Sequence, residues 1–115
     1  MTQDLRALTH AYITAFQNRD LEGVAAPMHE DFVLTDPENE ALGPRDNVLR
    51  FIAGLFDRAG TSLAFLPRTV LVDGAHSAIE FGLTVGQDHL EGIDLIEWQD
   101  GRMTSMLAHL TQRAK

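Results

Sequence analysis

The chain has 115 residues, of which 44% are hydrophobic, and its nine basic and seventeen acidic side chains give a net charge of −8. This length is typical of one domain, so we expect a single domain over residues 1–115. The acidic balance argues against a nucleic-acid partner and against an anionic membrane surface, because phosphate binding requires clustered Lys and Arg.

Nothing in the sequence indicates a disulfide-bonded, membrane-spanning or metal-dependent protein. Cysteine is absent, which excludes disulfides and thiolate chemistry. No apolar stretch approaches the roughly 20 residues of a membrane span, and the N-terminus lacks the basic start and apolar run of a signal peptide. The five histidines show no metal-ligand spacing. We therefore expect a cytoplasmic protein with no metal and no cofactor.

The N-terminal half predicts two helices, a strand and a third helix. Residues 2–20 carry apolar side chains at steps of three and four, which form one helical face. A short second helix runs from Leu21 to about Met28, where a nearby proline ends it. Residues 31–37 (DFVLTDP) form a short strand that a proline also stops, and a polar loop then leads to a helix over 43–57.

The C-terminal half predicts an antiparallel meander. Four strand-like runs cover residues 63–72, 76–85, 90–98 and 102–112. An Asp-Gly pair separates the first two runs and another separates the last two, which is a hairpin signal because both residues tolerate positive φ. Helices followed by such a meander predict an α+β fold in which the sheet curls around the helices.

Two strands each carry an acid in line with large apolar residues. Strand alternation places Asp94 on one face with Ile96 and Trp98, and it places Asp36 on one face with two apolar residues of its own strand. Burying a carboxylate in apolar surroundings is costly unless a partner compensates it. If both faces point inward, two carboxyls share one apolar pocket.

The opposite face of the same strand is also apolar. It carries Ile93 and Leu95, and the last strand adds Leu107 and His109 beside them. An apolar patch of this kind is large for the surface of a monomer. We therefore expect a homodimer formed by sheet-to-sheet packing.

The segments AYITAFQNRDLEGV, HEDFVLTDP and GIDLIEWQDGRMTSM resemble the SnoaL-like and ketosteroid-isomerase-like group of the NTF2-like superfamily. The resemblance follows nearly the whole chain in order. It implies a cone in which a strongly curved antiparallel sheet closes on three helices around a deep cavity, which would hold a small lipophilic substrate or ligand.

Among the enzymes of this group the chain resembles ketosteroid Δ5-isomerase, and the resemblance implies its site residues. Asp36 matches the general base, while Tyr12 and a neutral Asp94 match the oxyanion-hole donors of the Δ5-to-Δ4 reaction of steroids. Burial in an apolar wall would raise the pKa of Asp94 and keep it protonated. The residues expected to bind the substrate are apolar: Phe32, Phe51, Phe56, Phe81, Ile96, Trp98, Met106 and Leu110.

The chain departs from that pattern at two residues and in a shorter loop, GQDH, between the later strands. It has a single tyrosine, and Ile52 occupies the position of a second tyrosine that supports the first in well-studied members of the group. Leu110 likewise stands where an aromatic residue lines the pocket on the last strand. The cavity and its substrate are therefore expected to differ from those of the steroid enzymes.

Other interpretations remain open. A polyketide cyclase also needs one acid/base carboxyl in such a cone, whereas an epoxide hydrolase of the limonene type requires an arginine where this chain has Gly92. A non-catalytic module that binds an apolar ligand or dimerises is the third alternative. In that case Tyr12 is core packing, Asp36 orders the loop after its strand, and Asp94 forms an ion pair with Arg45 or Arg68.

Overall fold

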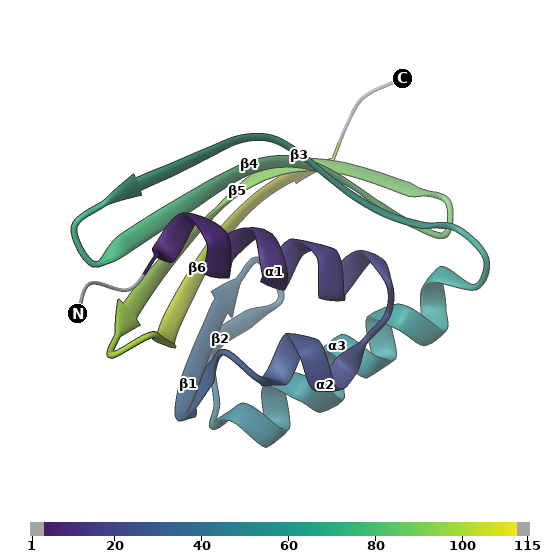
Figure 1. Cartoon of the computed structure of the whole chain (residues 1–115). Helices are drawn as coiled ribbons and strands as arrows, with labels where there is room; N and C mark the ends of the chain where they lie inside the picture. Colours follow the sequence, from purple (N-terminus) through teal and green to yellow (C-terminus); the bar gives the residue numbers. More distant parts are fainter. Residues whose placement is uncertain (1–3, 113–115) are drawn as a thin grey trace.

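The computed structural model describes residues 4–112, in which a bent sheet arches over three helices (Figure 1). No helix in this range combines the length and hydropathy that crossing a membrane requires. The elements in chain order are α1 (Leu5–Gln17), α2 (Leu21–Ala25), β1 (Met28–Asp36), β2 (Asn39–Leu42), α3 (Arg45–Ala59), β3 (Leu63–Asp73), β4 (His76–Val85), β5 (Asp88–Gln99) and β6 (Arg102–Gln112).

The strands form one sheet in the order β2-β1-β6-β5-β4-β3. β1 runs parallel to β6, and the other neighbouring pairs are antiparallel. The four long strands make the predicted meander, and all three helices lie on the concave side of the sheet (Figure 1). The predicted α+β class is therefore confirmed.

The largest differences from the sequence prediction lie around β1, which begins at Met28 and not at Asp31. The second helix ends at Ala25, because Met28 already belongs to β1 and pairs with Met103 of β6. The polar stretch predicted to be a loop contains β2, which pairs with the end of β1. The first difference arises from pairing between strands distant in sequence, which overrides weak local preferences. The second arises from a local hairpin between β1 and β2.

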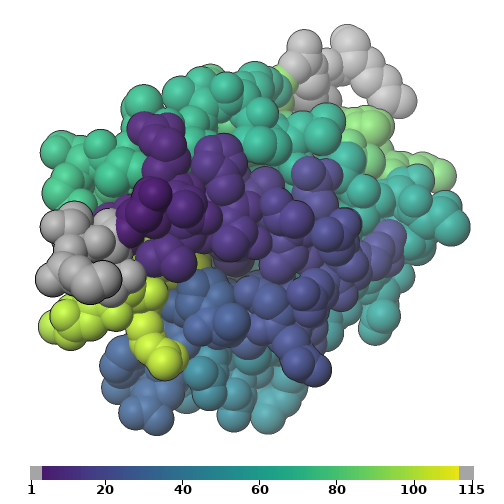
Figure 2. All heavy atoms as spheres, in the orientation of Figure 1, coloured from purple at the N-terminus to yellow at the C-terminus, as the bar shows by residue number. Residues whose placement is uncertain are grey.

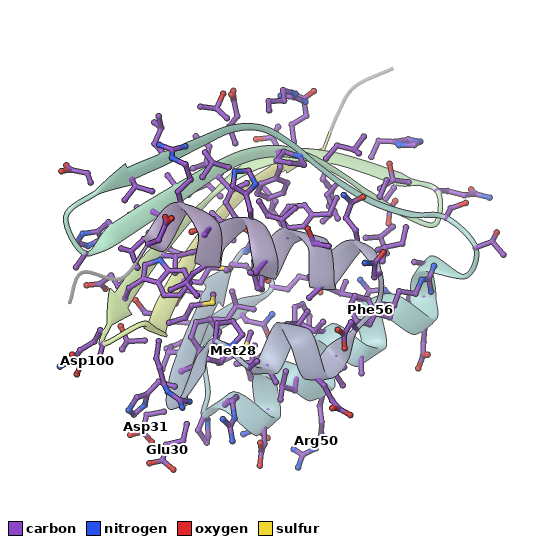
Figure 3. All side chains as sticks on the ribbon, viewed as in Figure 1. Met28, Glu30, Asp31, Arg50, Phe56 and Asp100 are labelled. Atoms are coloured by element: carbon purple, nitrogen blue, oxygen red, sulfur yellow. The ribbon has the colours of Figure 1, made fainter. Side chains whose placement is uncertain are left out.

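The layers enclose one apolar core. Met28 and Phe56 are buried within it, whereas Glu30, Arg50 and Asp100 are exposed and point outward (Figure 3). In the space-filling view, the atoms of α1 and α2 cover the face turned toward the viewer (Figure 2). The helices thus close this side of the molecule, and the concave face of the sheet forms the other wall of the core.

A chain of buried polar groups fixes α1 to the sheet. The indole nitrogen of Trp98 donates to the hydroxyl of Ser77 at 2.9 Å, and that hydroxyl lies 2.9 Å from the hydroxyl of Thr9. Thr9 and Ser77 are fully buried, and Thr9 also bonds to the Leu5 carbonyl. These contacts join α1, β4 and β5 at one end of the sheet.

We predict that Ser77→Ala lowers the free energy of unfolding by about 1–3 kcal/mol, because it leaves the Trp98 N–H buried without an acceptor. Chemical denaturation followed by circular dichroism measures the change. Ser105→Ala is the matched control, because this serine bonds to Glu97 at an exposed position and its loss should cost less than about 0.5 kcal/mol. Equal effects of the two substitutions would contradict the structural role of Ser77.

The convex face of the sheet carries the apolar patch predicted from the sequence. Ile93, Leu95 and Leu107 are 48%, 40% and 38% exposed, and His109 is exposed beside them. In the register of β5 and β6, Leu95 lies opposite Leu107 and Ile93 lies opposite His109. The four side chains therefore form one continuous patch.

We predict that this patch packs against its counterpart in a second copy. Light scattering at micromolar concentration should then return about twice the 12.7 kDa mass of one chain. Leu95→Asp should return the monomer mass, because it places a charge in the centre of the patch. A monomeric wild type would contradict the prediction.

Candidate active site

A cavity of about 70 Å³ lies between the concave face of the sheet and helices α1 and α3. Its walls are apolar except for the side chains of Tyr12, Asp36 and Asp94. These groups come from α1, β1 and β5, which are far apart in the sequence. The fold therefore brings together the three residues that the sequence resemblance singled out.

Tyr12 enters the cavity from the buried face of α1 and is only 4% exposed. Its ring packs edge-on against Phe65, with the ring centroids 6.4 Å apart. Burial raises the pKa of the Tyr12 phenol far above its usual value, and the charge of Asp94 raises it further. No hydrogen bond joins the Tyr12 hydroxyl to another residue within 4–112, so this neutral donor is available to a ligand in the cavity.

Asp94 occupies the middle of β5, between Ile79 of β4 and Ala108 of β6. It is 6% exposed, and its neighbours Ile93 and Leu95 point to the convex face, as strand alternation predicts. Burial raises the pKa of the Asp94 carboxyl to about 7, and the negative charge of Asp36 contributes to the rise. A substantial share of Asp94 is therefore protonated near neutral pH and can donate a hydrogen bond.

The alternative of an ion pair at Asp94 is wrong. Arg68 forms its salt bridge with Glu91, at 3.0 Å. Arg45 lies near Asp46 and donates a long hydrogen bond of 3.4 Å to the Met28 carbonyl. Neither arginine contacts Asp94, so no cation compensates this carboxyl within the part of the chain that the structure describes.

Arg45 also departs from the simplest expectation for a helix arginine, which is full solvation. Its side chain is 34% exposed, and its Nε is buried without a hydrogen-bond partner among the described residues. This arginine lies at the start of α3, outside the cavity lining. It therefore takes no part in the candidate site.

Asp36 lies at the end of β1, half-buried at the edge of the cavity. One carboxylate oxygen, Oδ1, accepts hydrogen bonds from the backbone N–H groups of Glu38 and Asn39 at 2.9 and 2.7 Å. The side-chain amide of Asn39 also donates to it, at 2.9 Å. Asp36 thus orders the turn into β2, as one interpretation of the sequence held. None of the residues 4–112 donates to Oδ2, which leaves this oxygen available for chemistry.

The residues expected to bind the substrate divide into two groups. Those in the cavity wall are Phe32, Phe51, Phe81, Met106 and Leu110. Phe56, Ile96 and Trp98 are buried but lie outside the wall. Trp98 is held by Ser77 at the closed end of the sheet, and Phe56 packs on Phe16 with the ring centroids 5.2 Å apart.

Sequence reasoning missed several wall residues that the same patterns could have found. Leu55 follows Phe51 by one turn of α3, and Leu83 follows Phe81 on the same face of β4. No such sequence pattern marks Phe65, because its contacts with the rings of Phe16 and Phe81 form only in the folded chain. Ile52 and Leu110 line the cavity with aliphatic side chains at the two positions where the resemblance placed aromatic ones.

Gly92 marks a close approach between β5 and β6. A Cβ atom at this position would lie 2.3 Å from the carbonyl oxygen of His109 and 2.6 Å from a methyl carbon of Leu110. No side chain fits there unless the strands move apart. The arginine that a limonene-type epoxide hydrolase needs is therefore excluded by the backbone as well as absent from the sequence.

Within residues 4–112, no group of three or more His, Asp or Glu side chains is arranged to hold a metal ion. Asp36 and Asp94 share the cavity with Tyr12 and apolar side chains only. The site thus places two carboxyls and one phenol in otherwise apolar surroundings.

Residues 9–106 match the family of SnoaL-like domains, and the chain therefore belongs to this family. Among solved structures it is similar to a candidate ketosteroid isomerase from Kribbella flavida, at 25% identity over 96% of this chain and 79% of that one, with a TM-score of 0.81. The resemblance to SnoaL-like, ketosteroid-isomerase-like proteins with an NTF2-like fold is thereby confirmed. No functionally curated protein matches the sequence.

Two further solved structures show how widely this fold is used. An LEH-like epoxide hydrolase from M. tuberculosis is 20% identical over 91% of this chain and 80% of that one, with a TM-score of 0.75. A de novo designed protein with a curved sheet is 16% identical over 96% of this chain and 88% of that one, with a TM-score of 0.79. Such a range shows that the fold does not determine the function, which has to be argued from the site.

We predict that Asp94 makes the protein less stable as the pH rises. The pKa of Asp94 is about 7 in the folded protein against 3.8 for an unperturbed aspartate. The folded state therefore binds more protons between these pH values, and stability falls as they are released. About three pKa units correspond to a loss of up to about 4 kcal/mol between pH 4 and pH 8.

Asp94→Asn removes this titration, so its unfolding free energy relative to wild type should increase across the same pH range. Urea denaturation at several pH values measures the difference. Asp88→Asn, at an exposed position at the start of the same strand, is the matched control and should show little pH dependence relative to wild type. A constant difference between wild type and Asp94→Asn would contradict the prediction.

Proposed function

We propose that the protein is a ketosteroid-isomerase-like enzyme that moves a C=C double bond in a lipophilic β,γ-unsaturated ketone by proton transfer. One observation carries the proposal. The only polar side chains in the cavity wall are Tyr12, Asp36 and Asp94, and none of them is neutralised by a cation within the described residues. A pocket that served packing or apolar binding alone would not need three such groups.

In the proposed reaction, Oδ2 of Asp36 takes a proton from the carbon between the carbonyl and the double bond. The electron pair of the broken C–H bond moves to the carbonyl oxygen and forms a dienolate. Asp36 then returns the same proton to the far carbon of the former double bond, which gives the conjugated ketone. The carboxylate is regenerated, and the reaction consumes nothing.

The dienolate oxygen carries the developing charge and needs hydrogen-bond donors. The Tyr12 hydroxyl and the protonated Asp94 carboxyl supply two, in a cavity from which the apolar walls exclude most water. One donor of this kind is typically worth about 3 kcal/mol of barrier. Because Asp94 donates only when protonated, and its pKa is about 7, turnover should decline as the pH rises above that value.

A polyketide cyclase is the second candidate, and the tether of Asp36 favours it. The three hydrogen bonds to Oδ1 limit how far the carboxylate can swing, and an isomerase base has to reach two carbon atoms. A cyclase base removes a single proton. The deprotonated carbon then attacks a carbonyl carbon of the same substrate, which forms the new carbon–carbon bond. Turnover of a β,γ-unsaturated ketone would support the isomerase over the cyclase.

A non-catalytic module is the remaining alternative, and phenol binding separates it from both enzymes. An oxyanion hole binds phenolates according to their basicity, whereas an apolar pocket does not discriminate between them. Isothermal titration with phenols of graded acidity at fixed pH measures this dependence. A flat series would contradict the catalytic proposals.

For the isomerase, we predict a graded response to substitution. Asp36→Asn should lower kcat by about 10²–10⁴-fold, because the base is lost. Tyr12→Phe should lower it by about 10²-fold. Asp94→Asn should be mild, because an amide also donates, and Asp94→Leu should be worse. The assay follows the ultraviolet absorbance of the conjugated product from a Δ5-3-ketosteroid and from 3-cyclohexenone.

Asp31→Asn is the control, because Asp31 lies on the same strand as Asp36 but points outward (Figure 3). It should leave turnover unchanged. Asp94→Asn should also lose the decline of activity above pH 7 that wild type shows, since its amide does not titrate. Turnover that survived Asp36→Asn unchanged would overturn the role of Asp36.

A further inference from the structure

The cavity is small compared with known ligand pockets. Its volume of about 70 Å³ is about half of the 150 Å³ that encloses a benzene ring in an engineered protein cavity. Pockets that hold drug-sized ligands span about 300–1,000 Å³. The cavity can therefore enclose a carbonyl group and its neighbouring carbons, but not a fused ring system.

The inner wall is already closely packed. Phe65 stands edge-on to both Phe16 and Phe81, with ring centroids 5.0 and 4.8 Å apart, and all three rings are at most 5% exposed. Tyr12 extends the same cluster by its edge contact with Phe65. Enlarging the cavity in this direction would separate several aromatic contacts at once, and protein interiors resist such changes.

The outer part of the wall is different. Phe51 and Leu55 of α3, Leu83 of β4 and Leu110 of β6 line the cavity but are only partly buried. Asp36 is half-buried as well, whereas Tyr12 and Asp94 are buried. These exposures place the mouth of the cavity at the four apolar side chains and put the base nearer to the mouth than the two donors.

From these dimensions we infer that the substrate is a small open-chain or monocyclic ketone, whose carbonyl enters the cavity while its apolar body lies among the mouth residues. This inference rests on the proposed function and narrows its substrate class. A rigid four-ring steroid does not fit this cavity, because the rings next to its carbonyl would have to occupy the closed interior. A flexible chain can turn at the mouth and leave the packed rings undisturbed.

Among the mouth residues, Leu110 limits the size of the substrate most directly. It lies opposite Gly92 in the register of β5 and β6, and a Cβ on Gly92 would come within 2.6 Å of its side chain. The leucine therefore occupies the space above the bare glycine on the concave face. Leu110→Ala should empty this space and widen the mouth without touching Tyr12, Asp36 or Asp94.

The test uses phenols that share one head group and similar acidity but differ in the body: phenol, 4-butylphenol, 2-naphthol and estradiol. Calorimetric titration gives each Kd without depending on turnover. Wild type should bind 4-butylphenol at least as tightly as phenol, and it should bind estradiol about tenfold or more weakly than 4-butylphenol, since misfit of a few carbon atoms has effects of this size. Leu110→Ala should improve estradiol binding more than phenol binding.

Leu71→Ala is the matched control, because it makes the same substitution at an exposed position of β3, away from the cavity lining and from the patch of Ile93, Leu95, Leu107 and His109. It should leave the order of affinities unchanged. Estradiol binding as tight as that of 4-butylphenol in wild type would overturn the size limit while leaving the proposed proton transfer intact. Failure of every phenol to bind would overturn the donor site itself, and the size inference with it.

Discussion

The attachment of α1 to the sheet controls the geometry of the whole site. The hydroxyls of Thr9 and Ser77 and the indole of Trp98 meet in the core, where no water competes for their hydrogen bonds. Tyr12 follows Thr9 by three residues and lies on the same buried face of the helix. Because these hydrogen bonds hold Thr9, they fix the rotation of α1 about its axis and its distance from the sheet. The phenol of Tyr12 is thereby positioned in the cavity.

If the proposed function holds, the carboxyl of Asp94 serves catalysis at a cost in stability. An isoleucine in its place would pack between Ile79 and Ala108 with no unpaired polar group. The acid instead remains buried without a cation, and its raised pKa reflects the free energy needed to charge it there. Active sites tolerate such unfavourable groups when the chemistry depends on them.

The features that could be predicted from the sequence were those with a strict period. Alternation placed Asp94 inside and Ile93 outside correctly, because each residue of a strand points opposite to the one before it. β2 escaped prediction, since the turn before it is closed by the Asp36 carboxylate and not by turn residues alone. The cavity lining was predictable only in part, because sequence shows that Phe56 and Phe81 are both buried but not which of them borders empty space.

The bare backbone at Gly92 has an evolutionary consequence. Any substitution there must force β5 and β6 apart before a side chain can act, so a lineage carrying this glycine has no single-step path toward arginine-assisted ring opening. The partly exposed residues Phe51, Leu55, Leu83 and Leu110 have no such restriction. Sequence change should therefore be tolerated more readily at those four positions, where it alters the shape of the cavity mouth, than at Gly92.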